Sequence, residues 1–218
     1  EGTYSPSTNG ETFAIELFSH VNLIGAGEEV TIIDAEQSDR VFNMEGCDNN
    51  TISELTITGG LPESNWGGGM LLNYSNPTLT NVTIANNTAY YGGGMYLDYS
   101  DPILTHVTIS NNTAGAGGGI YLYNCFSNIE NVTITDNSAN SGGGIYCSLS
   151  SLNLINSILW NNSTEEIYFN QSTDSSSIAA YYSDIEGGQD SIVTNDNGTV
   201  TWGAGNIDVY PLFVDSPN

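Results

Sequence analysis

Three near-copies of one unit follow one another between Val82 and Asn156, and this stretch decides the fold. The copies begin Val82-Thr-Ile-Ala-Asn-Asn-Thr-Ala, Val107-Thr-Ile-Ser-Asn-Asn-Thr-Ala and Val132-Thr-Ile-Thr-Asp-Asn-Ser-Ala, and each continues into a Gly-Gly-Gly triplet. The period is 25 residues, since 107 − 82 and 132 − 107 both equal 25. A constant period of this size is typical of repeat architectures, in which stacked units bury a shared core.

Each unit contains three short apolar patches and no pattern long enough for a helix. The first patch is Val-x-Ile, the second follows the glycines at alternate positions, and the third is one aliphatic residue three positions before the next unit. Helices need ten or more periodic residues, which no segment between turn signals provides. Three short strands per unit, with like residues in register, predict one coil of a parallel β-helix, and the chain length gives about eight coils.

We expect a single domain over residues 1–218. Regular repeats are predicted from about 30 to 156, with a two-residue insertion at 61–65 where proline and polar residues tolerate it. Degenerate C-terminal coils and a cap are predicted over about 157–218, including a polar loop at 173–177.

The glycine pattern is lost in this C-terminal region. Glu165 and Glu166 stand near the positions where glycines are expected. We expect Leu212 and Phe213 to pack across the last coil as its cap.

The formal net charge is −24, and Arg40 is the one residue among the 218 that is Lys or Arg. Such a surface repels phosphate backbones and anionic lipid, so nucleic-acid binding and membrane-surface binding are disfavoured. No apolar run approaches the roughly 18 residues of a membrane span. We expect no cofactor, with calcium as an open alternative because hard cations bind carboxylate and carbonyl oxygens.

The repeat resembles the right-handed parallel β-helix repeats of secreted bacterial proteins and the repeats of chlamydial polymorphic membrane protein adhesins. The motifs that carry this resemblance are Gly93-Gly94-Met95, Gly118-Gly119-Ile120 and Gly143-Gly144-Ile145, together with Ile84…Asn87 and its equivalents, in which Ile replaces the Phe of the adhesin motif. The resemblance implies an all-β, single-stranded right-handed parallel β-helix solenoid. It also implies a secreted or cell-surface location.

Two outward-facing series are candidate recognition surfaces. The residue between two core positions after the glycines must face outward, which gives Tyr96, Tyr121 and Tyr146. Tyrosines along a ridge would bind sugar faces or a partner chain, or would stack on each other as part of the sheet. The second series is a threonine column, predicted at Thr31, Thr56, Thr83, Thr108 and Thr133.

The predicted role is a non-catalytic extracellular scaffold, adhesin or filament-forming subunit that binds glycans or other cell-surface ligands. Open ends of a β-helix expose unpaired strands, so end-to-end self-association is expected.

Two alternatives stay open. A polysaccharide-active enzyme would need paired carboxylates, and an ice-binding solenoid would use the threonine column, which resembles the flat face of such proteins. The candidate carboxylates are Asp34, Glu36, Asp39, Glu45, Asp48 and Glu54. Arg40, beside Asp39, is expected to form a surface ion pair.

Overall fold

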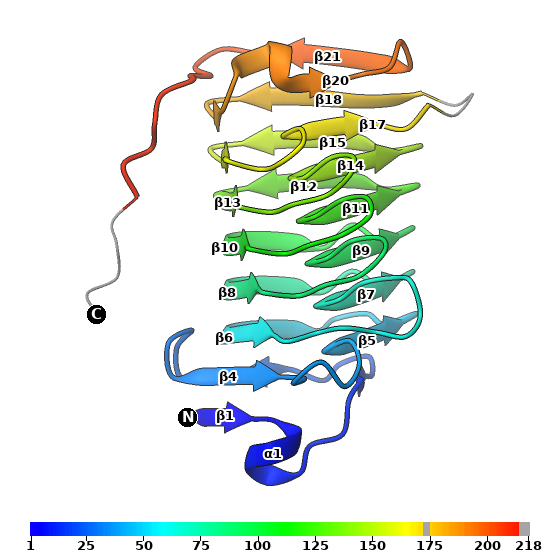
Figure 1. Cartoon of the computed structure of the whole chain (residues 1–218), viewed down its shortest axis with the longest axis vertical. Coiled ribbons are helices and arrows are strands. Elements are labelled where there is room, and N and C mark those ends of the chain that lie inside the picture. Colours follow the sequence, from blue (N-terminus) through cyan, green and yellow to red (C-terminus); the bar gives the residue numbers. More distant parts are fainter. Residues whose placement is uncertain (172–174, 214–218) are drawn as a thin grey trace.

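The computed structural model describes residues 1–171 and 175–213, and within these ranges the chain winds as a parallel β-helix (Figure 1). All strand pairs in these ranges are parallel and join one coil to the next. Residues 172–174, which include 173 and 174 of the predicted polar loop, and residues 214–218 of the predicted cap lie outside the described residues.

Two parallel sheets run the length of the stack. We call them the large sheet and the small sheet, according to the number of strands that each has in the described ranges. The large sheet contains 13 strands: β1 (Gly2–Tyr4), β3 (Leu23–Ile24), β4 (Thr31–Asp34), β6 (Thr51–Thr58), β8 (Thr78–Ala85), β10 (Ile103–Ser110), β12 (Phe126–Glu130), β13 (Val132–Thr135), β15 (Ser151–Ile155), β16 (Ile158–Trp160), β18 (Ser176–Tyr181), β19 (Asp184–Ile185) and β21 (Gly198–Trp202).

The small sheet contributes one strand to each coil. Within the described ranges its eight strands are β2 (Ile15–Leu17), β5 (Phe42–Glu45), β7 (Met70–Asn73), β9 (Met95–Asp98), β11 (Ile120–Tyr123), β14 (Ile145–Ser148), β17 (Ile167–Phe169) and β20 (Ile192–Val193). The described elements also include one turn of helix, α1 (Pro6–Asn9), and one 3-10 turn, η1 (Gly188–Ser191). The prediction of an all-β solenoid of about eight coils is therefore confirmed.

The repeated residues have the structural roles that their spacing predicts. Val82, Val107 and Val132 are buried one above the other, as are the isoleucines two positions on. The large sheet bends where a residue adopts a left-handed conformation, such as Asn81 (φ 52°) and His106 (φ 52°). A glycine is required at positions like Gly93, because an added Cβ would lie 2.6 Å from the Gly118 carbonyl oxygen of the next coil.

The predicted cap is wrong for the described part of the C-terminus. Ile207 forms a bridge with Asp184 of an earlier coil, and the Val209 amide donates to the Asp184 carboxylate at 3.1 Å. These contacts direct the chain back along the side of the stack (Figure 1). Leu212 is consequently 77% exposed instead of covering the last coil.

Candidate functional site

One outward position of every small-sheet strand falls in a single column, which we call the outer column. From the N-terminal end it contains Glu16, Asn43, Leu71, Tyr96, Tyr121, Tyr146, Tyr168 and Val193. The column is polar in the first two coils, aromatic from the fourth to the seventh, and aliphatic at Leu71 and Val193. The prediction that Tyr96, Tyr121 and Tyr146 align in successive coils is confirmed.

These tyrosines stack face to face along the column. Ring centroids are 5.1 Å apart between Tyr96 and Tyr121, 4.6 Å between Tyr121 and Tyr146, and 5.3 Å between Tyr146 and Tyr168. Tyr121 is 9% exposed, and burial raises the pKa of Tyr146 to about 12. Because neighbours occupy the faces of these rings, the ladder presents edges rather than open faces, as expected if the tyrosines stack on each other as part of the sheet.

Three aromatic residues that the periodicity did not reveal lie beside this ladder. Tyr91 packs edge-on against Tyr121 at 5.3 Å and against Tyr90 at 4.6 Å. Trp66 is tilted against Tyr96 at 6.4 Å. Trp66 is 45% exposed and Tyr90 is 58% exposed, so these two rings still offer surface to a ligand.

A polar cleft of about 400 Å³ adjoins Trp66 at the N-terminal end of the outer column. We call it the Arg40 cleft, and it is lined by Ala14, Glu16, Asp39, Arg40, Asn43, Glu45, Ser64, Trp66, Leu71 and Asn73. Its walls come from strands β2, β5 and β7 and from the insertion that lengthens the repeat before Trp66. The cleft therefore combines an aromatic ring, carboxylates, amides and the one Lys or Arg side chain of the protein.

Arg40 is buried, so the predicted surface ion pair is wrong. Its Nη2 donates to the Ser64 hydroxyl, while Nη1 is buried without a hydrogen-bond partner among the described residues. The Asp39 carboxylate accepts from the Arg40 backbone N–H at 2.7 Å. Burial lowers the pKa of Arg40, and the negative charges of Asp39 and Glu16 oppose this shift.

The cleft contains two side-chain amides, of Asn43 and Asn73, and they differ in their hydrogen bonding. Asn43 Nδ2 donates to both carboxylate oxygens of Glu16, at 2.9 and 2.8 Å. Asn73 Oδ1 is buried and has no partner in the described part of the chain. A buried polar atom without a partner is uncommon in proteins and needs an explanation.

The threonine column is confirmed for Thr56, Thr83, Thr108 and Thr133, which align in successive coils of the large sheet. The prediction for Thr31 is wrong. The step from β4 to β6 is 24 residues (57 − 33), so Ile32, not Thr31, lies opposite Thr56. Thr31 is instead 6% exposed, and its hydroxyl accepts from the Ala26 N–H at 2.9 Å.

A loop residue covers the N-terminal part of the threonine column. The Thr56 hydroxyl donates to the Glu28 backbone carbonyl at 2.7 Å, and the Thr83 hydroxyl donates to the Glu28 carboxylate at 3.0 Å. The flat, uninterrupted hydroxyl array that ice binding needs is thus reduced to Thr108 and Thr133. Ice binding stays an untested alternative without further support from this surface.

The six predicted carboxylates do not gather at one site. Asp39 and Glu45 share the Arg40 cleft, where Glu16, which the sequence analysis missed, joins them. Glu36 instead accepts hydrogen bonds from Ser5 and Ser7, which lower its pKa. Asp34 and Glu54 bond to nearby groups, Asp34 to the Glu36 N–H and Glu54 to Asn81, and Asp48 is exposed.

A second acidic hollow lies near the C-terminal end of the stack, around Glu166 and Glu186. Burial raises the pKa of Glu166 to about 7, hydrogen bonds from Asn162 lower it, and the negative charge of Glu186 raises it further. Both Glu166 carboxylate oxygens accept hydrogen bonds from Asn162, so Glu166 has a structural role.

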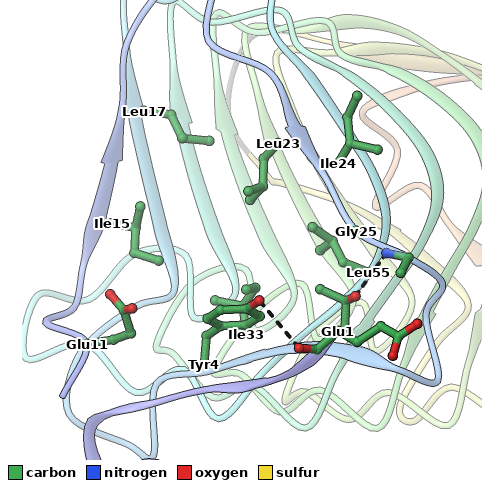
Figure 2. Close-up of a pocket in the computed structure, with 12 residues that line it drawn as sticks. Glu1, Tyr4, Glu11, Ile15, Leu17, Leu23, Ile24, Gly25, Ile33 and Leu55 are labelled. Atoms are coloured by element: carbon green, nitrogen blue, oxygen red, sulfur yellow. Dashed lines mark hydrogen bonds between the residues drawn. The ribbon is translucent and has the colours of Figure 1, made fainter. Parts of the chain in front are cut away.

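The N-terminal end of the core contains an apolar hollow of about 430 Å³ (Figure 2). Ile15, Leu17, Leu23, Ile33 and Leu55 line it. It is the place where an additional coil would find aliphatic surface, and end-to-end self-association remains a prediction.

Neither a metal site nor a membrane span is evident in the described ranges. No group of three or more His, Cys, Asp or Glu side chains there is arranged to hold a metal ion. No helix among the described residues is long and apolar enough to cross a membrane.

Comparison with known proteins identifies the family. Residues 19–157, more than half of the chain, match the family described as right handed beta helix region, so the chain belongs to this family. The predicted right-handed β-helix is thereby confirmed, whereas the similarity to polymorphic membrane protein adhesins is not. No curated protein and no solved structure gives a match.

Proposed function

We propose that this protein is a non-catalytic, extracellular β-helix module that binds glycans on the outer face of its small sheet. The observation that carries the proposal is the partly exposed Trp66 ring beside the Arg40 cleft. Aromatic rings with free surface pack against the apolar faces of sugar rings, while polar groups nearby fix orientation. The secreted or cell-surface location rests on the resemblance of the repeats to secreted bacterial proteins.

The shape of this face suits an extended ligand. The outer column continues from the polar cleft into the edges of the tyrosine ladder without leaving the small sheet. A polysaccharide chain lying along the stack would contact the cleft, Trp66 and successive tyrosine edges. The rigid stacking of the coils would hold these contacts in place before the ligand arrives, which lowers the entropy cost of binding.

Binding to a panel of soluble polysaccharides tests the proposal, by affinity electrophoresis and isothermal titration calorimetry. We expect Trp66→Ala to weaken binding at least about tenfold, the range of an aromatic anchor residue. Phe126→Ala is the matched control, because Phe126 is 72% exposed and lies on β12 of the large sheet. No binding to any glycan, or equal losses in both variants, would contradict the proposal.

A polysaccharide-active enzyme is the second candidate, because Glu16, Asp39 and Glu45 line one cleft. Two carboxylates at a suitable separation are sufficient for glycoside hydrolysis. Release of reducing sugar from the bound polysaccharide, abolished by Glu45→Gln with binding retained, would establish this candidate. It would replace the non-catalytic assignment.

A further inference from the structure

The Arg40 cleft contains one hydrogen-bond donor and one acceptor that the described residues leave unpaired. The donor is Nη1 of Arg40, a side chain that is more than nine-tenths buried. The acceptor is Oδ1 of Asn73, and both residues line the cleft. A buried group without a partner is costly, so a ligand that pairs with both atoms would remove that cost.

We infer that the Arg40 cleft is a subsite for an uncharged, hydroxyl-rich sugar residue, and that it disfavours uronic acids. This inference rests on the glycan-binding function proposed above. A sugar hydroxyl both accepts and donates a hydrogen bond, so neighbouring hydroxyls of one ring satisfy both the guanidinium N–H and the amide oxygen.

The charge of the cleft distinguishes the classes of ligand. Glu16, Asp39 and Glu45 contribute −3 and Arg40 contributes +1, which gives a formal charge of −2. A sugar carboxylate would be repelled by these acids, and a carboxylate placed against Asn73 Oδ1 could not donate a hydrogen bond to it. An ammonium group would be attracted, but it has no acceptor for the Arg40 N–H.

Trp66 supplies the apolar contact that a neutral sugar also requires. Its ring lines the same cleft, and the neighbouring wall is the aliphatic Leu71. A pyranose has an apolar face and a rim of hydroxyls. It would therefore place its face on Trp66 and its rim toward Arg40 and Asn73.

Calorimetry with three sets of oligosaccharides tests the inference: neutral glucan and mannan oligomers, oligogalacturonate and glucosamine oligomers. We expect a neutral oligomer to bind at least about tenfold more tightly than oligogalacturonate, and more tightly than the glucosamine oligomer. Arg40→Gln should weaken binding of the neutral oligomer at least tenfold, and Asn73→Ala several-fold. Phe126→Ala should leave it unchanged.

Arg40 is buried, so Arg40→Gln is checked for its circular dichroism spectrum and melting temperature. If that variant fails to fold, Asn73→Ala decides, because it removes the acceptor and leaves the arginine in place. Neutral-sugar binding that is lost in Trp66→Ala but intact in Asn73→Ala and Arg40→Gln would overturn the subsite and leave the proposed function standing. Tighter binding of oligogalacturonate or of the glucosamine oligomer would also overturn the subsite. Absence of binding to every oligomer would contradict the proposed function itself.

Discussion

The side-chain amide of Asn162 donates a hydrogen bond to the Glu166 carboxylate across 2.6 Å, and this bond ends a ladder of buried amides. The ladder runs through Asn87, Asn112 and Asn137, whose side chains bond to the next rung at 3.1, 3.0 and 2.9 Å. The Asn162 backbone N–H also donates to Glu166, at 3.0 Å. Glu166 thus accepts from both the backbone N–H and the side-chain amide of Asn162, as the asparagine of the next rung does elsewhere in the ladder.

A carboxyl group in this position makes stability depend on pH. The pKa of Glu166 is about 7 in the folded protein, against an ordinary value of 4.5, chiefly because the group is buried. Above pH 4.5 the unfolded chain releases this proton more readily than the folded chain does, so the free energy of unfolding falls as pH rises toward 7. At about 1.4 kcal/mol per unit of pKa difference, the loss by pH 8 is roughly 3 kcal/mol.

Glu166→Gln isolates this effect, since glutamine offers an amide oxygen to Asn162 and carries no charge. Urea unfolding at pH 4.5 and pH 8 should show the variant close to the wild type at the lower pH and more stable at the higher one. A difference between the two proteins that does not change with pH would rule out Glu166 as the titrating group.

Removal of an inner rung should be more damaging than removal of its exposed neighbour. Asn112→Ala removes the side chain that accepts from the Asn87 N–H and donates to the Ile84 carbonyl. The Asn87 side-chain amide loses one acceptor and keeps the Ile57 and Ala85 carbonyls. Each buried unpaired group costs about 1–3 kcal/mol, so we expect a loss of roughly 3 kcal/mol or more in urea unfolding. Asn111→Gly is the control, because Asn111 is exposed and its φ of 56° suits glycine.

Most of the fold could be predicted from sequence because the coil constrains the same positions in every repeat. Gly93 recurs at a fixed step because the backbone of the next coil leaves no room for a side chain there. Asn112 recurs because its side-chain oxygen accepts from the Asn87 backbone N–H of the previous coil. Thr31 was misplaced because Ile32 and Ile33 are adjacent aliphatic residues. The apolar pattern therefore allows β4 to pair with β6 at a step of either 25 or 24 residues, and it does not show that the step in the structure is 24.

The Arg40 cleft could not be predicted in the same way, since Glu16, Asn43 and Leu71 stand at a repeated position but differ in residue type from the tyrosines of later coils. Trp66 and Ser64 belong to or adjoin the insertion at residues 61–65, and Glu16 lies before the regular repeats. The insertion was the available signal, because insertions in solenoids map to loops that often form the binding face.

The tyrosine ladder is expected to contribute to stability as well as to the binding surface. Tyr121 is stacked between Tyr96 and Tyr146 and is contacted edge-on by Tyr91. Truncation of a buried aromatic side chain costs about 3–5 kcal/mol, so Tyr121→Ala should lower the unfolding free energy by roughly 3 kcal/mol. Tyr121→Phe keeps the ring and should change it by less than about 1 kcal/mol. Equal losses in both variants would show that the hydroxyl, not stacking, stabilises the ladder.

The three cysteines are expected to be unreactive in the folded protein. Cys47, Cys125 and Cys147 are free and buried, and burial raises the pKa of Cys125 to about 12 and that of Cys147 well above its ordinary range. Because the thiolate is the reactive form, Ellman's reagent at pH 8 should label none of them in native protein and all three in urea. A Cys147→Ala variant, which should release one thiol fewer in urea, checks the count. Rapid labelling of any thiol in the native protein would mean that its coil opens far more readily than the buried core of this stack implies.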